Sequence, residues 1–187
     1  MDRIIASVLL ILIALNPKTH SATVYDENNE IIENVVIEES EETAESFSTY
    51  NEVETILYFI SEEYIKTGSE YLEKLIPEKR VIICEDVSLE EGIIRELING
   101  SDSDDLVTII PNNLKLLSVE VIDETAFLNF SKEGLNGGSL EEYFTIKQIV
   151  DSLFELDNIE KVQFLVEGEK TESLMGHIGV FEPFERQ

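Results

Sequence analysis

The sequence predicts an α+β domain in which two helices pack on one face of a small mixed or antiparallel sheet. Two segments carry apolar residues at helical spacing, and both open with the same four residues, Ser-Leu-Glu-Glu. The segments around them are short runs of β-branched and aromatic residues, which favour strands. The chain from residue 52 to residue 187 has about 135 residues, enough for one core without metals or disulfides. We therefore expect a single domain over residues 52–187.

The first part of this domain is expected to hold two strands and a helix. Residues 53–60 and 75–84 are rich in β-branched and aromatic residues. Ser88 begins a helix as a capping box, because its hydroxyl can accept from the N–H of Glu91 while the Glu91 carboxylate reaches back. Gly100 ends this helix, since glycine readily adopts the left-handed conformation found there.

A hairpin is predicted next. Residues 114–122 and 126–130 alternate apolar and polar side chains, which is typical of strands with one buried face. They are separated by Asp123-Glu124-Thr125, a polar connection short enough to join antiparallel neighbours.

The sequence of the last part of the domain predicts a longer helix and a buried strand. A second capping box at residues 139–142 begins a helix that ends near Leu156. Residues 162–166 form the strand, which turns at Glu167-Gly168. An apolar stretch at residues 178–181 indicates a final edge strand.

The charge of the chain excludes several kinds of partner. There are 13 Lys and Arg residues against 40 Asp and Glu residues, a formal net charge of −27. Binding to nucleic acid through its phosphates needs a basic surface, and anionic lipid headgroups would be repelled in the same way. The acidity is concentrated, because eleven carboxylates lie between Asp26 and Glu54, and no basic residue occurs between Lys18 and Lys66.

Residues 23–51 are predicted to form an acidic, disordered tether. Like charges keep such a segment extended and solvated. One apolar island at residues 31–37 interrupts it. The island forms a short transient strand or no structure, or else it folds when it docks on a partner.

Residues 1–22 are predicted to be a signal peptide or an uncut N-terminal anchor. Arg3 precedes a mostly apolar run at residues 4–15, which small polar residues follow. As a helix this run would span about 18 Å, less than the hydrocarbon core of a bilayer. Export with cleavage after Ala22 and retention as a membrane tether through residues 4–15 both remain open.

Few residues form a pattern typical of catalysis or metal binding. Cys84 lies in an apolar run typical of a buried strand. Asp102 and Asp104 resemble the start of a calcium loop, but Val107 stands where that loop needs glycine. His177 has no Gly-x-Ser-x-Gly sequence beside it to present a nucleophile. We therefore expect a protein that is not an enzyme and has no catalytic, cofactor-binding or metal-binding residues.

Several ordered blocks of the sequence resemble a known family. They lie in the expected strands, helix ends and turns, in this order: Tyr58-Phe59, Pro77-Glu78-Lys79-Arg80, Leu97 with Gly100, Ile110-Pro111, Leu116-Leu117-Ser118-Val119, Leu128-Asn129-Phe130-Ser131 and residues 162–168. From residue 53 to residue 183 the chain is similar to the GerMN domain, a sporulation and germination domain of exported proteins and some lipoproteins of spore-forming bacteria. The chain departs from the family pattern at Asn129, where Asp is usual, and at Glu124, where Gly is usual.

The resemblance implies an α+β module similar to the ring-building domains of secretion and sporulation complexes, acting by protein contact. It brings no catalytic residues. Its most family-like blocks make Asn129, Ser131, Glu167 and Gly168 candidates for contact with a partner. A structural role is the alternative for all four, because a polar cap after a strand and a glycine turn would have the same sequence.

The predicted leader, the tether and the resemblance together indicate an extracytoplasmic protein, secreted or anchored to the outer face of the cytoplasmic membrane. We expect a non-catalytic module that contacts a protein partner in the cell envelope and helps assemble or stabilise a complex in sporulation or spore germination. The alternatives are a module that binds cell-wall fragments or calcium, and a wall hydrolase. The sequence leaves the oligomeric state open.

Overall fold

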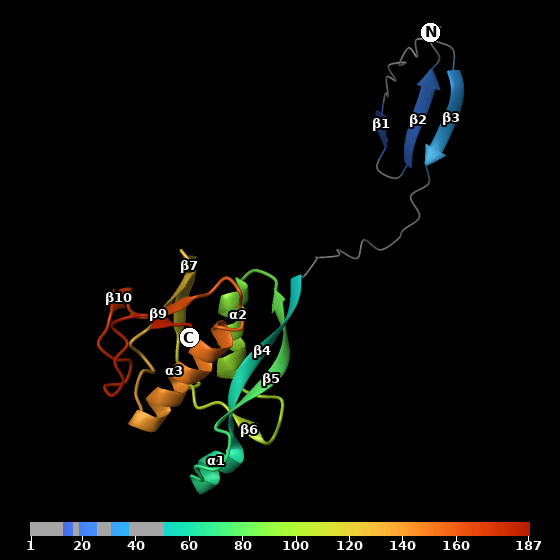
Figure 1. Ribbon diagram of the computed structural model, residues 1–187. Helices are drawn as coiled ribbons and strands as arrows, with labels where there is room; N and C mark the ends of the chain where they lie inside the picture. Colours follow the sequence, from blue (N-terminus) through green and yellow to red (C-terminus); the bar gives the residue numbers. More distant parts are fainter. Residues whose placement is uncertain (1–12, 17–18, 26–30, 38–50) are drawn as a thin grey trace, which may run out of the picture. The chain divides into compact units, whose positions relative to one another are not determined.

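The computed structural model describes residues 13–16, 19–25, 31–37 and 51–187, with side chains from residue 52 onward. The chain divides into two compact units, residues 1–48 and 49–187 (Figure 1). In the first unit three strands form an antiparallel sheet in the order β1-β2-β3. Their bounds are Ile13–Asn16 for β1, Thr19–Tyr25 for β2 and Ile31–Ile37 for β3.

This first unit differs from the extended segment that the sequence predicted. Strand β3 coincides with the apolar island, whose β-branched residues favour strands, and β2 crosses residue 22, where the predicted leader ends. The rest of the predicted leader and tether, residues 1–12, 17–18, 26–30 and 38–50, lies outside the described residues. Where the leader and the tether end therefore stays a prediction.

The second unit begins with a three-stranded sheet in the order β5-β4-β6. Strands β4 (Asn51–Ser61) and β5 (Leu75–Cys84) pair antiparallel along ten residues, and both were predicted. Strand β6 (Leu106–Val107) pairs only with the last residues of β4. A short helix, α1 (Glu62–Thr67), follows β4; six residues give too little periodicity for a sequence prediction.

A second sheet has five strands, and it combines antiparallel and parallel pairs. The predicted hairpin consists of β7 (Leu116–Ile122) and β8 (Thr125–Phe130), and β9 (Lys161–Val166) pairs parallel to β8. Two short strands, β10 (Glu169–Lys170) and β11 (Phe184–Glu185), pair with the other edge of β9. This arrangement leaves β7 at the outer edge of the sheet.

Helix α2 (Leu89–Asn99) begins and ends at the predicted residues, although Gly100 has an extended ψ of −179° and not the left-handed helical conformation that was expected. The Ser88 hydroxyl accepts from the Glu91 N–H at 3.2 Å, and Gly100 follows the helix with a φ of +99°. The Glu91 carboxylate does not reach back, because it accepts from the Arg95 guanidinium at 2.5 Å instead. Only half of the expected capping box is therefore formed.

Helix α3 (Ser139–Leu153) begins one residue earlier than predicted, and only half of a capping box forms there, because Gly138 has no side chain to accept from the Glu141 N–H. Gly138 is the capping residue, and its N–H donates to the Glu141 carboxylate at 2.6 Å. Glu142, which the sequence pattern assigned to the box, is fully buried instead. The shift arises because Glu142 points into the protein, where other backbone groups use its carboxylate.

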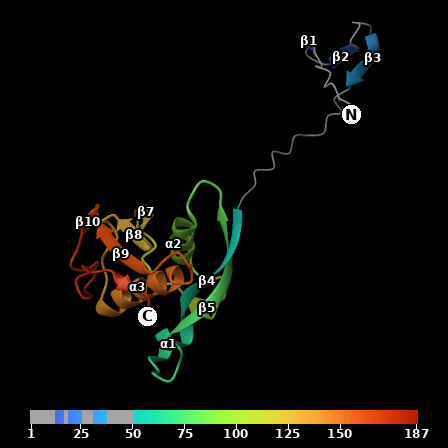
Figure 2. The same cartoon turned by 45° about the horizontal axis from the view of Figure 1, so that its top comes forward.

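Both long helices lie between the two sheets (Figures 1 and 2). Fully buried apolar residues come from each sheet and each helix: Leu57, Phe59, Ile93, Leu97, Leu128, Phe130, Ile149, Leu153 and Phe164. The α+β fold class is confirmed. It differs in detail from the single sheet expected, because the strands divide into two sheets that share one core.

Helix α3 also completes the edge of β4 that β6 does not reach. The Tyr58 N–H donates to the Ser152 hydroxyl at 2.9 Å, and the Tyr58 carbonyl accepts from the Gln148 side chain at 3.1 Å. The Gln148 carbonyl in turn accepts from the Ile109 N–H at 3.1 Å. Buried polar side chains of the helix thus take the place of a neighbouring strand.

Candidate functional site

The four residues predicted to contact a partner come together at one end of the second sheet. Asn129 and Ser131 lie at the end of β8, and Glu167 and Gly168 form the turn between β9 and β10. The Gly168 N–H donates to the Asn129 side-chain oxygen at 2.8 Å. The Ser131 hydroxyl donates to the Glu167 carboxylate at 3.0 Å. The predicted grouping therefore exists in space.

The Glu167 carboxylate is held by its surroundings. It accepts from the backbone N–H of Lys132 at 2.7 Å, and this bond, followed by the Ser131 hydroxyl, lowers the pKa of Glu167 below its ordinary value. Glu167 and Gly168 have φ values of +51° and +83°, as a two-residue hairpin turn requires. These hydrogen bonds are the ones expected if the four residues only stabilise the turn. A contact between these residues and a partner stays a prediction.

A groove adjoins this cluster on the outward face of the second sheet. Its volume is about 270 Å³, and its walls come from β7, β8, β9 and the turn: Ser118, Glu120, Ile122, Phe127, Asn129, Leu165 and Gly168. Asn129 and Gly168 line it, whereas Ser131 and Glu167 do not. Sequence reasoning missed the β7 side of this groove, although the alternation in residues 114–122 already places Ser118, Glu120 and Ile122 on one face.

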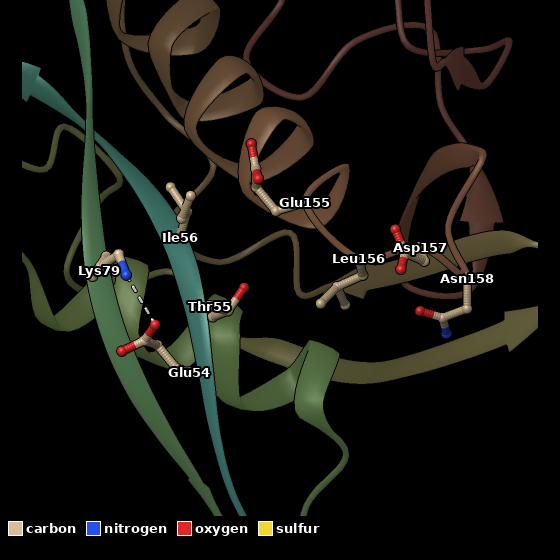
Figure 3. Close-up of a pocket in the computed structure, with 8 residues that line it drawn as sticks. All are labelled: Glu54, Thr55, Ile56, Lys79, Glu155, Leu156, Asp157 and Asn158. Atoms are coloured by element: carbon tan, nitrogen blue, oxygen red, sulfur yellow. Dashed lines mark hydrogen bonds and ion pairs between the residues drawn. The ribbon is translucent and has the colours of Figure 1, made fainter.

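A larger cleft, of about 390 Å³, lies between the β5-β4-β6 sheet and the end of α3, as Figure 3 shows. Its lining residues are Glu54, Thr55, Ile56, Lys79, Glu155, Leu156, Asp157 and Asn158. The Lys79 ammonium lies 3.0 Å from the Glu54 carboxylate, and both side chains are largely exposed. Glu155 accepts from the Tyr58 hydroxyl at 2.8 Å, and this bond, with burial, raises the pKa of Tyr58 to about 12. These contacts hold the surface together, and they pair no nucleophile with a base among the lining residues.

The other residues considered for chemistry lie apart from one another. The exposed His177 ring has its Nε2 atom 3.2 Å from the Gly137 carbonyl oxygen. Cys84 is half-buried at the end of β5 and packs against the core. The Asp102 carboxylate lies 3.2 Å from the Arg80 guanidinium. Within the described ranges, no three His, Cys, Asp or Glu side chains gather closely enough to hold a metal ion.

Glu142 has a structural role that the sequence pattern did not reveal. One carboxylate oxygen accepts from the N–H groups of Leu174 and Met175 at 2.8 and 2.7 Å. The other accepts from those of His177 and Ile178 at 2.7 and 3.0 Å. One buried carboxylate thus satisfies four backbone donors, and it fixes the segment before β11 against the start of α3.

None of the described helices has the length and apolar composition needed to cross a membrane. No curated protein sequence matches the chain significantly. Four chains of solved structures do match, among them three from Clostridium perfringens and Bacillus subtilis. A crystal structure from Clostridium perfringens, described as that of a candidate lipoprotein, is 28% identical, with 73% of this chain and 89% of that chain covered and a TM-score of 0.49.

Two matches are to the sporulation protein GerM of Bacillus subtilis. Its tandem GerMN domains are 21% identical, with 74% of this chain and 47% of that chain covered and a TM-score of 0.58. Its first GerMN domain alone is 16% identical, with 72% and 98% covered and a TM-score of 0.56. These structures share the fold of the second unit, and this chain spans about half of the tandem protein.

A family of known proteins also matches by sequence. The match is to Germane, described as sporulation and spore germination, and it covers residues 56–172. That range runs from β4 through β10 and includes all four candidate contact residues and the groove beside them. The family is described by a cellular process and not by a reaction. The resemblance to the GerMN domain is therefore confirmed, and the chain belongs to the Germane family of sporulation and spore germination domains.

Proposed function

We propose that this protein is a non-catalytic protein-interaction module that helps to assemble or stabilise an envelope complex in sporulation or spore germination. The family match over residues 56–172 is the observation that carries the proposal. The described surface is consistent with it. The residues considered for catalysis are dispersed, and the family-like residues Asn129 and Gly168 line an open groove.

We further propose that the domain acts outside the cytoplasm. The support is in the sequence: the apolar run at residues 4–15 after a basic residue is typical of an export signal or an anchor. An acidic segment between such a run and a domain would keep the domain in solution near the membrane. A fusion of residues 1–51 to a reporter that is active only after export tests this point. Reporter activity supports the location, and its absence contradicts it.

Deletion of the gene tests the cellular role. Heat-resistant spore yield or germination should fall, and a copy of the gene supplied in trans should restore it. A copy that lacks residues 52–187 should not restore it, because the proposal assigns the role to the domain. Normal sporulation and normal germination in the deletion strain would contradict the proposal.

A further inference from the structure

Strand β7 carries a backbone edge that the described part of the chain leaves open. It pairs with β8 on one side and lies at the end of its sheet, and among the residues that the structure describes no backbone hydrogen bond joins residues 116–122 to anything but β8. The two-residue turn makes Ile122 and Thr125 a hydrogen-bonded pair, and the pairing then alternates along the strands. The N–H and C=O groups of Val119 and Val121 therefore point outward.

The side chains on this edge are also open to binding. Leu117, Val121 and Ile122 are 50%, 38% and 53% exposed, so the strand offers apolar side chains to a partner. Protected edges carry Lys, Pro or an irregularity. β7 contains no Lys or Pro, and its only irregularity lies between Leu116 and Ser118, before the regular part begins.

The groove beside this edge is lined by one charged residue. Glu120 lies between Ser118 and Ile122 on the groove face, and no basic side chain within the described residues forms an ion pair with it. Of the basic residues that pair within this sheet, Lys161 is engaged with Glu185 at 2.6 Å, and the Lys170 ammonium lies 5.3 Å from the centroid of the Phe181 ring. Asp123 and Glu124 add negative charge at the adjoining turn. A complementary ligand would carry Lys or Arg.

We propose that β7 binds an extended segment of a partner protein as an added strand, with a Lys or Arg of that segment beside Glu120 and an apolar side chain beside Ile122. The inference rests on the proposed function and identifies the partner's chemistry. Backbone bonds to Val119 and Val121 would supply the pairing, and the groove would supply selectivity. A second copy of β7 fits less well, because antiparallel self-pairing brings like charges together. The acidic residues 23–51 carry no basic residue to offer.

The test uses the full chain and a random library of displayed peptides of about ten residues, long enough to form one strand. Selected peptides should carry a Lys or Arg two positions from an apolar residue, because Glu120 and Ile122 lie two residues apart on the same face of β7. Glu120→Lys should weaken their binding about tenfold or more, because it replaces attraction with repulsion. Glu169→Lys is the matched control, since it makes the same charge change at an exposed position outside the groove, and it should leave binding almost unchanged.

A backbone variant tests the pairing itself. Val121→Pro removes one outward N–H without breaking a bond to β8, so it should reduce binding about tenfold while leaving the unfolding temperature close to that of the parent. Peptides without Lys or Arg enrichment, equal effects of the two Lys variants, or failure to select any peptide would overturn the inference. These outcomes are separate from the gene-deletion result, which tests the cellular role and not the binding edge.

Discussion

The two sheets of the second unit differ in how well their edge strands are protected from further pairing. In the first sheet, the Tyr58 backbone on β4 is completed by Ser152 and Gln148 of α3. The outer strand β5 carries Pro77, which has no N–H to donate to an added strand, and the charged Lys79. In the second sheet β7 has neither protection. The difference indicates that the first sheet serves the stability of the fold, while one edge of the second is available for contact.

On the other side of the second sheet, β10 and β11 pair with β9, and Glu142 helps to hold β11 in place. It anchors the segment that leads to β11, which pairs with β9. We expect Glu142→Ala to have the largest effect on folding, a loss of about 3–5 kcal/mol, because four backbone donors lose one buried acceptor. Urea unfolding followed by circular dichroism measures the loss.

Glu141→Ala is the matched control for that variant. It removes only the bond to the Gly138 N–H at the exposed start of α3, so it should cost about 1 kcal/mol. Equal losses for Glu141→Ala and Glu142→Ala would show that Glu142 is an ordinary helix-start residue.

Gln148→Leu should have the next largest effect. Leu fills a similar volume but leaves the Tyr58 carbonyl and the Ile109 N–H without their partner, at a cost of about 2–3 kcal/mol. Lys147→Leu, at the neighbouring position, breaks only the partly exposed pair with Asp151 and should cost less than about 1 kcal/mol. If the two variants unfold at the same urea concentration, α3 does not complete the β4 edge as described.

The Glu167 carboxyl should titrate below its ordinary pKa. A lowered pKa in the folded state means that its contribution to stability is present above the unfolded-state pKa and is lost as the pH falls through the folded-state pKa. Ser131→Ala removes one of the two bonds that lower this pKa, so the pKa should rise toward the ordinary value. An NMR titration of the Glu167 side chain measures it. An unchanged pKa in Ser131→Ala would contradict the geometry of the cluster.

Ile122→Lys should have the smallest effect on stability, within about 0.5 kcal/mol of the parent, because this side chain is already exposed. The same variant should reduce binding of the selected peptides, since it removes an apolar contact and adds a charge that repels their Lys and Arg residues. Thermal unfolding and peptide titration on one preparation separate the two effects. A large loss of stability would mean that β7 belongs to the closed part of the fold.

Much of the fold could be predicted because its signals are local. The β-branched run of β5, the Ser88 cap of α2 and the polar turn at Asp123-Glu124 each depend on neighbouring residues. The start of α3 was predicted one residue too late, because the sequence does not distinguish Glu141, which caps the helix, from Glu142, which is buried. The division into two sheets depends on which strands pair across the chain, and local patterns do not determine that.

The candidate site was predicted in part. Asn129, Ser131, Glu167 and Gly168 were identified from family-like blocks, and the parallel pairing of β8 with β9 brings them together. The groove was missed because it requires the register that sets Glu120 opposite Phe127 and Asn129 opposite Leu165. The role of Glu142 was missed because its partners, residues 174–178, are more than 30 positions away.

Site-specific photocrosslinking in sporulating cells tests whether the open β7 edge is the surface that binds the partner. A photoreactive residue would replace Ile122 in the groove or, as a control, the similarly exposed Ile83 on β5. Mass spectrometry would then identify the crosslinked peptide. We predict crosslinks from position 122, and not from position 83, to a Lys- or Arg-containing segment of an envelope protein. Crosslinks from position 83 alone, or none from position 122, would contradict the claim.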